Sequence, residues 1–180
     1  MNTTPILFDT DPGIDDAMAL LMLARDPRAR LLGVTTVFGN ASIDTTTRNA
    51  LALCERFGID VPVARGAARP LVRHTGDYPD MIHGRDGMGN VGLAAATRQR
   101  AEALPAPRFI CEMAKRHEGE LVLVAVGPFT NLALALAHDP SIVDRVKAVV
   151  VMGGAFGTHG HGGNVSPVAE ANVFNDPRFF

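Results

Sequence analysis

Short apolar segments alternate with helical patterns along this chain, and this alternation limits its fold more than any other feature of the sequence. The strand-like segments lie at about residues 5–9, 31–37, 61–64, 121–126 and 147–152. The helical patterns lie at about 14–25, 43–57, 106–117 and 129–138. Alternating strands and helices are typical of a mostly parallel sheet. We therefore predict an α/β fold in which one open, mostly parallel, Rossmann-like sheet is flanked by helices, with residues 1–180 forming a single domain.

The last two predicted strands are almost continuously apolar, at residues 121–126 and 146–151. Strands of a parallel sheet have this composition when helices cover both faces. We therefore expect both strands to be covered on both faces.

Composition excludes several classes of protein. Hydrophobic residues make up 47% of the 180 residues and the formal net charge is −2, which is typical of a soluble globular protein without the basic excess of a nucleic-acid binder. No apolar run reaches the about 18 residues of a membrane-spanning helix. The N-terminus shows no signal-peptide pattern, so we expect a cytoplasmic location. Cys54 and Cys111 lack the spacing of metal ligands and are interpreted as buried thiols.

Four carboxylates lie within eight residues directly after the first apolar segment: Asp9, Asp11, Asp15 and Asp16. Two like charges about 4 Å apart repel by about 4 kcal/mol at an effective dielectric constant of about 20, so such a cluster indicates a bound cation or shifted pKa values. Oxygen ligands favour Ca²⁺ or Mg²⁺. Helix capping is the alternative, because Asp11 and Pro12 also suit a helix N-terminus, but it accounts for only one or two of the carboxylates.

Polar residues also follow the later strands, at Asn40 and Thr130. In a parallel sheet these positions share one edge with the aspartates, where open α/β sheets bind ligands. For Asn40 a simple turn role is the alternative. The loop at 163–172 adds Asn164, Glu170 and Asn172, whose amide and carboxylate groups suit the hydroxyls of a sugar.

The segment at about 65–104 is rich in glycine and proline and has little apolar periodicity. Long segments of this kind are often functional, for example as active-site flaps. His83 lies in this segment and is expected to approach a ligand when such a flap closes, with an inert loop histidine as the alternative. The pair His159 and His161 resembles a metal pair, but its glycine-rich surroundings supply no third ligand.

The order of these motifs resembles the nucleoside hydrolases, the inosine-uridine-preferring ribohydrolase group. The resemblance runs from about residue 5 to Pro177. It is carried by the run Asp9-Thr10-Asp11-Pro12-Gly13-Ile14-Asp15-Asp16 and by the later blocks Gly39-Asn40, His83-Gly84, Gly127-Pro128-Phe129-Thr130-Asn131-Leu132, Val151-Met152-Gly153-Gly154 and Gly163 to Asn172.

The resemblance implies calcium-dependent hydrolysis of the N-glycosidic bond of purine or pyrimidine ribonucleosides, which gives ribose and free base. It implies Asp11, Asp16 and the backbone carbonyl of Thr130 as Ca²⁺ ligands, with Asp11 also the general base. The implied substrate contacts are Asp15 and Asn40 at the ribose and the water, Asn164, Glu170 and Asn172 at the ribose hydroxyls, Met152 in the sugar pocket, and His83 on the base side. A homo-oligomer, dimeric or tetrameric, is expected by the same resemblance.

The family fold continues beyond the part that this sequence matches, and we expect the C-terminal portion of that fold to be absent from these 180 residues. Apolar surface would then be exposed to water and favour association. A catalytically impaired homologue that only binds Ca²⁺ or nucleoside is therefore an alternative. A more remote one is a Mg²⁺-dependent phosphatase resembling the haloacid dehalogenases, with Asp9 as nucleophile and Asp11 as acid/base. That reading needs a lysine before an acidic pair, and neither Lys115 nor Lys147, the only lysines, provides one.

Overall fold

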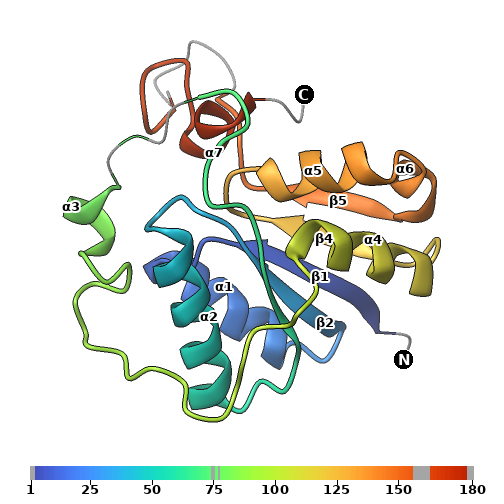
Figure 1. Ribbon diagram of the computed structural model, residues 1–180, viewed down its shortest axis with the longest axis horizontal. Coiled ribbons are helices and arrows are strands. Elements are labelled where there is room, and N and C mark those ends of the chain that lie inside the picture. Colours follow the sequence, from blue (N-terminus) through green and yellow to red (C-terminus); the bar gives the residue numbers. More distant parts are fainter. Residues whose placement is uncertain (1–2, 74–75, 77, 156–162, 178–180) are drawn as a thin grey trace.

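A parallel sheet forms the centre of the molecule, as the alternating pattern predicts (Figure 1). The computed structural model describes residues 3–73, 76, 78–155 and 163–177. Five strands in this part pair in the order β3-β2-β1-β4-β5, all in parallel. Their bounds are β1 Thr4–Thr10, β2 Ala29–Thr36, β3 Val63–Arg65, β4 Val122–Ala125 and β5 Ala148–Val151.

The four predicted helices are present, and three short ones accompany them. The predicted helices are α1 Ile14–Arg25, α2 Ile43–Phe57, α4 Ala106–Arg116 and α5 Thr130–His138. The short helices are α3 Asp80–His83, α6 Ile142–Arg145 and α7 Ala171–Asn175. Helices of four or five residues complete little more than one turn, so they leave no apolar period in the sequence.

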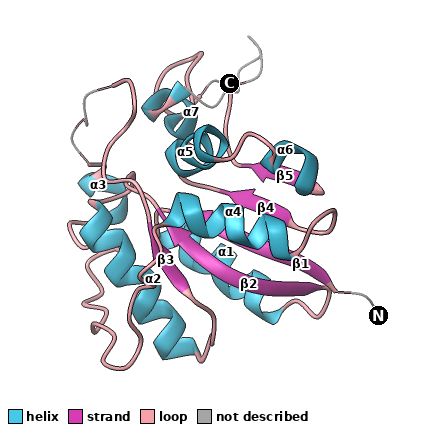
Figure 2. Ribbon diagram, turned by 45° about the vertical axis from the view of Figure 1, so that its right-hand side comes forward, coloured by secondary structure: helices cyan, strands magenta, loops and turns pink. Residues whose placement is uncertain are grey.

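Helices cover both faces of the sheet and enclose two apolar cores (Figure 2). Successive side chains of a strand point to opposite faces, and Leu7 and Phe8 of β1 accordingly belong to different cores. Phe8 packs in the core that includes residues of α1 and α2, and Leu7 packs in the core that includes residues of α4, α5 and α6. Cys54 and Cys111 are buried free thiols, as expected.

The order in which the chain adds strands to the sheet reverses at β1, which makes the carboxyl end of β1 a topological switch point. From β1 the chain runs outward through β2 to β3, and it then crosses to β4 on the other side of β1. Ligands of open α/β sheets bind at the carboxyl ends of the strands where the order reverses in this way. The segments after β1 and β4 therefore define the candidate site.

The expectation that the fifth strand is covered on both faces is wrong. Val149, Val150 and Val151 of β5 are 39%, 53% and 36% exposed. Among the described residues β5 pairs only with β4, so it forms an edge of the sheet, and an apolar composition alone cannot distinguish an edge strand from a central one. In β4 the prediction holds for Leu123 and Ala125, which are buried.

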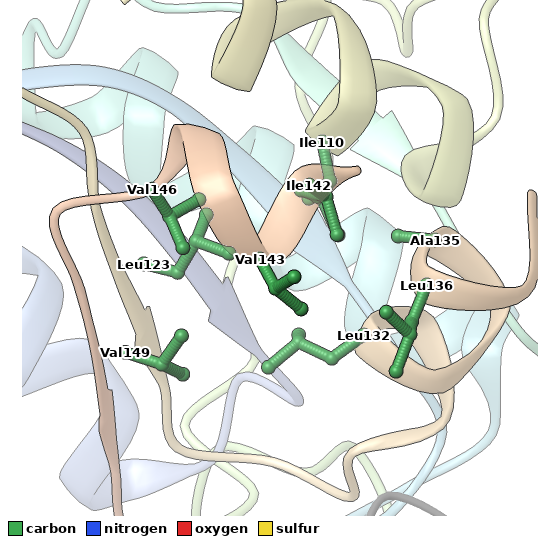
Figure 3. A pocket seen from close by; sticks show the side chains of 9 residues that line it. All are labelled: Ile110, Leu123, Leu132, Ala135, Leu136, Ile142, Val143, Val146 and Val149. Atoms are coloured by element: carbon green, nitrogen blue, oxygen red, sulfur yellow. The ribbon is translucent and has the colours of Figure 1, made fainter. Parts of the chain in front are cut away.

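An apolar hollow of about 270 Å³ lies beside this edge (Figure 3). Its walls come from α4, α5, α6 and the last two strands, and they include Leu132, Leu136, Val143 and Val149. Within the described ranges, no helix is both long and apolar enough to cross a lipid bilayer.

In the described part of the segment at 65–104, α3 is the one helix, and the residues between the end of β3 and the start of α4 are otherwise irregular. The segment is anchored to α2 through Glu55, whose carboxylate accepts hydrogen bonds from the backbone N–H groups of Thr97, Arg98 and Gln99. These three bonds hold the pKa of Glu55 down at about 2.

Candidate active site

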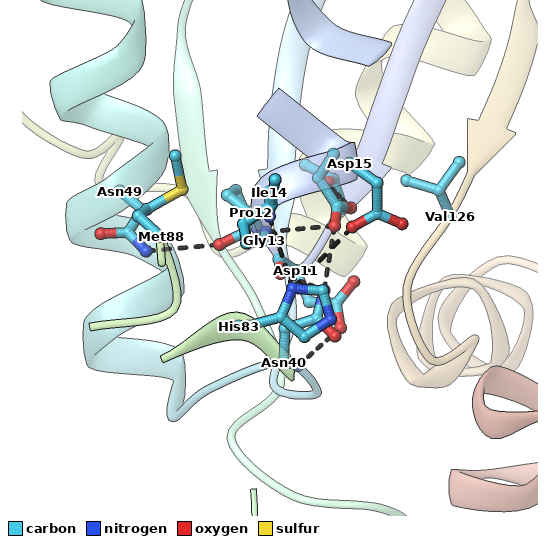
Figure 4. Close-up of polar contacts among 12 residues, drawn as sticks. Asp11, Pro12, Gly13, Ile14, Asp15, Asn40, Asn49, His83, Met88 and Val126 are labelled. Atoms are coloured by element: carbon cyan, nitrogen blue, oxygen red, sulfur yellow. Dashed lines mark hydrogen bonds and ion pairs between the residues drawn. The ribbon is translucent and has the colours of Figure 1, made fainter. Parts of the chain in front are cut away.

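The aspartate run forms the turn between β1 and α1, so its four carboxylates differ in environment. Asp9, Asp11 and Asp16 are buried, with 3%, 2% and 5% of their surface exposed, whereas the Asp15 side chain is 79% exposed. Asp15 lies in the first turn of α1 with its side chain exposed (Figure 4), whereas the Asp16 carboxylate accepts a hydrogen bond from the Thr10 hydroxyl of β1. The turn therefore gathers three buried carboxyl groups at the switch point of the sheet.

Asp9 serves the scaffold beneath the site. Its Oδ1 accepts hydrogen bonds from the Thr35 hydroxyl of β2 and, at 2.8 Å, from the Asn131 amide of α5. Burial raises its pKa to about 7, although both hydrogen bonds oppose that shift. A buried carboxyl group whose Oδ1 already accepts two hydrogen bonds is not an accessible nucleophile, and this geometry argues against the phosphatase alternative.

Asn40 connects the two carboxylates that the resemblance assigns to calcium. Its backbone N–H donates to Asp11 Oδ2 at 2.8 Å, and its side-chain amide donates to Asp16 Oδ2 at 2.9 Å (Figure 4). Asp16 also accepts from the Thr10 hydroxyl and from the Gly13 N–H. Asn40 is therefore part of the site and more than a turn residue.

Burial raises the pKa of both Asp11 and Asp16, and the neighbouring Asp16 charge raises that of Asp11 further. Asp11 Oδ1 is buried and has no hydrogen-bond partner among the described residues. An unpartnered carboxylate oxygen in a buried acidic pair is the environment that a hard cation stabilises. The pair fits two Ca²⁺ ligands, although no group of three or more His, Cys, Asp or Glu side chains suited to a metal occurs in the described ranges.

His83 approaches the same turn from α3. Its Nδ1 lies 3.4 Å from the backbone nitrogen of Ile14, which donates to it, and 3.9 Å from an oxygen of Asp15. The absence of a side chain at Gly13 makes this approach possible, because a Cβ atom there would lie 2.6 Å from His83 Nδ1 and 2.6 Å from the Asn40 amide nitrogen. His83 thus lies against the aspartate turn.

Helix α7 brings the later predicted residues toward the end of β4. The Asn172 amide donates to the backbone carbonyls of Val126 at 2.8 Å and Met152 at 3.0 Å. Glu170 is buried and accepts from the backbone N–H groups of Asn172, Val173 and Gly154, which makes it the N-cap of α7. Asn164 Oδ1 accepts from the Ala171 N–H.

The structure gives Thr130 a neighbour that the sequence did not indicate. Thr130 is the first residue of α5, and its buried hydroxyl donates to Asp176 Oδ2 at 2.7 Å. Asp176 and Asn131 were both missed as candidate residues. Their positions, one directly before a proline and one within the Gly127–Leu132 block, are the signals that could have identified them. The histidine pair at 159 and 161 lies outside the described residues.

A cavity of about 270 Å³ opens between these elements. Asp11, Asn40 and Asn172 line it, so three residues that were predicted from separate parts of the sequence line the same cavity. Its other walls are largely aromatic or apolar and include Phe38, Tyr78, Pro79, Val165 and Phe174. Polar groups at one side of an apolar cleft are typical of small-molecule sites.

The family model described as inosine-uridine preferring nucleoside hydrolase matches residues 6–178. The chain belongs to this nucleoside hydrolase family. Uridine nucleosidase 1 of Arabidopsis thaliana is 47% identical over 173 residues, which cover 96% of this chain and 50% of that protein. Pyrimidine-specific ribonucleoside hydrolase RihB of Escherichia coli is 40% identical over 177 residues, covering 98% of this chain and 55% of RihB.

The fold agrees with this family assignment. A plant nucleoside hydrolase, the PpNRh1 enzyme, superposes with a TM-score of 0.90 at 38% identity, covering 97% of this chain and 54% of that one. The nucleoside hydrolase chain thus spans about half the length of the relatives it matches.

Proposed function

We propose that this chain hydrolyses the N-glycosidic bond of ribonucleosides, with Ca²⁺ held by Asp11 and Asp16, and releases ribose and free base. The observation that carries the proposal is the cavity lined jointly by Asp11, Asn40 and Asn172 in a chain of the nucleoside hydrolase family. Because relatives at 47% and 40% identity are named as a uridine nucleosidase and a pyrimidine-specific hydrolase, uridine is the first substrate to test.

The proposed chemistry begins with the water. Asp11 takes a proton at a carboxylate oxygen, as a general base, from the water whose oxygen bonds to C1′ as the C1′–N bond breaks, and the departing nucleobase takes up a proton from solvent water. When bound, Ca²⁺ supplies the positive charge that keeps the buried carboxylates ionised and makes a neighbouring water more acidic. The backbone N–H of Asn40 donates to Asp11 Oδ2 and thereby orients the Asp11 carboxylate, the proposed general base.

The sugar is proposed to bind in the cavity between the aspartate turn and α7. The amide groups of Asn172 and Asn164 and the carboxylate of Glu170 are proposed to bind the ribose hydroxyls. Met152 is proposed to make an apolar contact with the sugar, and Asp15 to place a second carboxylate near the ribose. Breaking the glycosidic bond develops positive charge on the ribose, which nearby carboxylates stabilise. His83 is proposed to contact the nucleobase. Fixing the sugar against the water supplies a further part of the rate enhancement.

Ribose release from uridine and from inosine, with added Ca²⁺ and then with a chelator, tests the proposal. We expect release that depends on Ca²⁺, and we expect Asp11→Ala to lower kcat by about 10²-fold or more, the usual contribution of a general base. Asp144→Ala changes an exposed aspartate of α6 and is the matched control. A folded chain that binds nucleoside without releasing ribose would instead support the catalytically impaired alternative.

A further inference from the structure

Helix α7 forms one wall of the cavity although it is only five residues long. Ala171, Asn172, Phe174 and Asn175 all line the cavity. A helix of this length has little stability of its own, so its position must come from contacts with the rest of the fold. The residue that follows α7 makes one of these contacts.

Asp176 directly follows α7 and is 1% exposed. Its Oδ2 accepts two hydrogen bonds, one from the Thr130 hydroxyl at 2.7 Å and one from the Leu71 N–H at 2.9 Å. Thr130 begins α5, and Leu71 lies seven residues before Tyr78, which lines the cavity together with Pro79. One buried carboxylate thus joins the end of α7 to the start of α5 and to Leu71, close before Tyr78 in the sequence.

A second contact links α7 to the same stretch of chain. The guanidinium of Arg73 lies over the ring of Phe174, 4.0 Å from its centroid. Arg73 is exposed, so this contact is weaker than a buried hydrogen bond to a charged group. Asp176 is therefore the principal connection between α7 and this stretch, and Arg73 supplements it.

We propose that Asp176 is a positioning residue that sets the spacing between α7 and the wall carrying Tyr78, and so the shape of the nucleoside cavity. It acts through Thr130 and Leu71 and contacts no reacting atom. Its effect on turnover rests on the proposed function, whereas its effect on the cavity wall does not.

The composition of the chain provides a probe of the wall itself. Tyr78 is the only tyrosine and there is no tryptophan, so tyrosine fluorescence reports on the cavity alone. Acrylamide quenching of Tyr78 is measured without any substrate in wild type, Asp176→Asn and Thr130→Val. We expect the quenching constant to rise about twofold in Asp176→Asn and by less in Thr130→Val, because local opening exposes the half-buried ring.

Asp144→Asn is the matched control, an exposed aspartate on α6 for which no change in quenching is expected. Thr130→Val removes one donor and preserves the side-chain volume, so it tests the contact if Asp176→Asn fails to fold. In the double variant the effects are expected to be less than additive, since Asp176→Asn weakens, by removing the charge of the acceptor, the same hydrogen bond whose donor Thr130→Val removes. Far-UV circular dichroism establishes that each variant is folded.

With uridine as substrate, Asp176→Asn is expected to raise KM about fivefold with kcat nearly unchanged, the pattern of weakened substrate binding. Unchanged Tyr78 quenching in folded Asp176→Asn and Thr130→Val would overturn the proposal. Changed quenching in a chain without hydrolase activity would support the positioning role and contradict only the proposed function.

Discussion

At the scale of single residues, the site depends on carboxyl groups that are buried at a cost in stability. Asp9, Asp11 and Asp16 lie together with no Lys or Arg among the partners described for them. Burial disfavours the charged form of each, which is why all three pKa values are raised. The ionised site is therefore less stable than the protonated one until a cation binds.

The variant Asp9→Asn tests the cost in stability of burying an ionised carboxylate at this position. The pKa of Asp9 is about 7 in the folded chain against 3.8 for the free side chain, so its contribution to stability is complete below about pH 4 and is lost as the pH rises through 7. A shift of this size corresponds to about 4 kcal/mol. We expect Asp9→Asn, which cannot ionise, to gain stability relative to wild type as the pH rises from 4.5 to 8.

Urea unfolding at several pH values, in the presence of a chelator, measures this difference. The hydrogen bonds from Thr35 and Asn131 can be kept by the amide oxygen, so the variant retains most of the contacts of Asp9. A stability difference that is the same at every pH would show that Asp9 does not titrate in this range.

The sequence predicted which residues lie near one another at the candidate site better than it predicted the contacts they make. Asp11 and Asn40 meet at one cavity because parallel strands bring their carboxyl ends to one edge, and Asn172 joins them from α7. Glu170 illustrates the limit, since spacing cannot tell that its carboxylate caps α7 through two backbone N–H groups of the helix and also accepts from the Gly154 N–H. Asp176 shows the same limit, because its partner Thr130 lies 46 residues earlier in the chain.

At the scale of elements, the predictions agree with the structure wherever a long apolar pattern exists. Helices α1, α2, α4 and α5 and all five strands lie close to their predicted positions. Helix α7 could not be predicted, because side-chain hydrogen bonds to distant residues hold it in place. The exposure of β5 could not be predicted either, since it depends on which elements lie beside the strand.

The contact of α4 with β2 depends on Gly33. A Cβ atom at Gly33 would lie 2.9 Å from the ring of Phe109, closer than carbon atoms pack. We expect Gly33→Val to lower the free energy of unfolding by about 1–3 kcal/mol through overpacking. Chemical denaturation measures this loss.

Gly76→Val is the control, because a Cβ atom at Gly76 has no heavy atom within 4 Å and the same substitution there adds no clash. Equal effects of the two substitutions would show that α4 can move away from β2 without loss of stability.

At the scale of the whole molecule, the edge at β5 is the most exposed apolar feature of the sheet. Val150 is 53% exposed, and the hollow between β5, α5 and α6 lies close by. An exposed apolar edge strand is a template for association. We expect the purified chain to associate with increasing concentration and Val150→Lys to reduce this association, as measured by sedimentation velocity.

Val91→Lys is the control for this prediction, since Val91 is 71% exposed in the irregular segment far from β5 in sequence. Neither substitution is expected to change the free energy of unfolding by more than about 0.5 kcal/mol. A wild-type chain that stays monomeric at all concentrations would contradict the prediction.

The central position of β1 also has a kinetic consequence. β1 precedes the other described strands in sequence, but one of its neighbours, β4, follows more than a hundred residues later, and Asp9 meets Asn131 across 122 residues. Contacts over such separations close slowly, because the intervening chain must first lose its freedom. During synthesis the aspartate turn emerges well before α5, so it acquires its complete surroundings only after α5 has emerged. The acidic centre is therefore among the last parts of the sheet to mature.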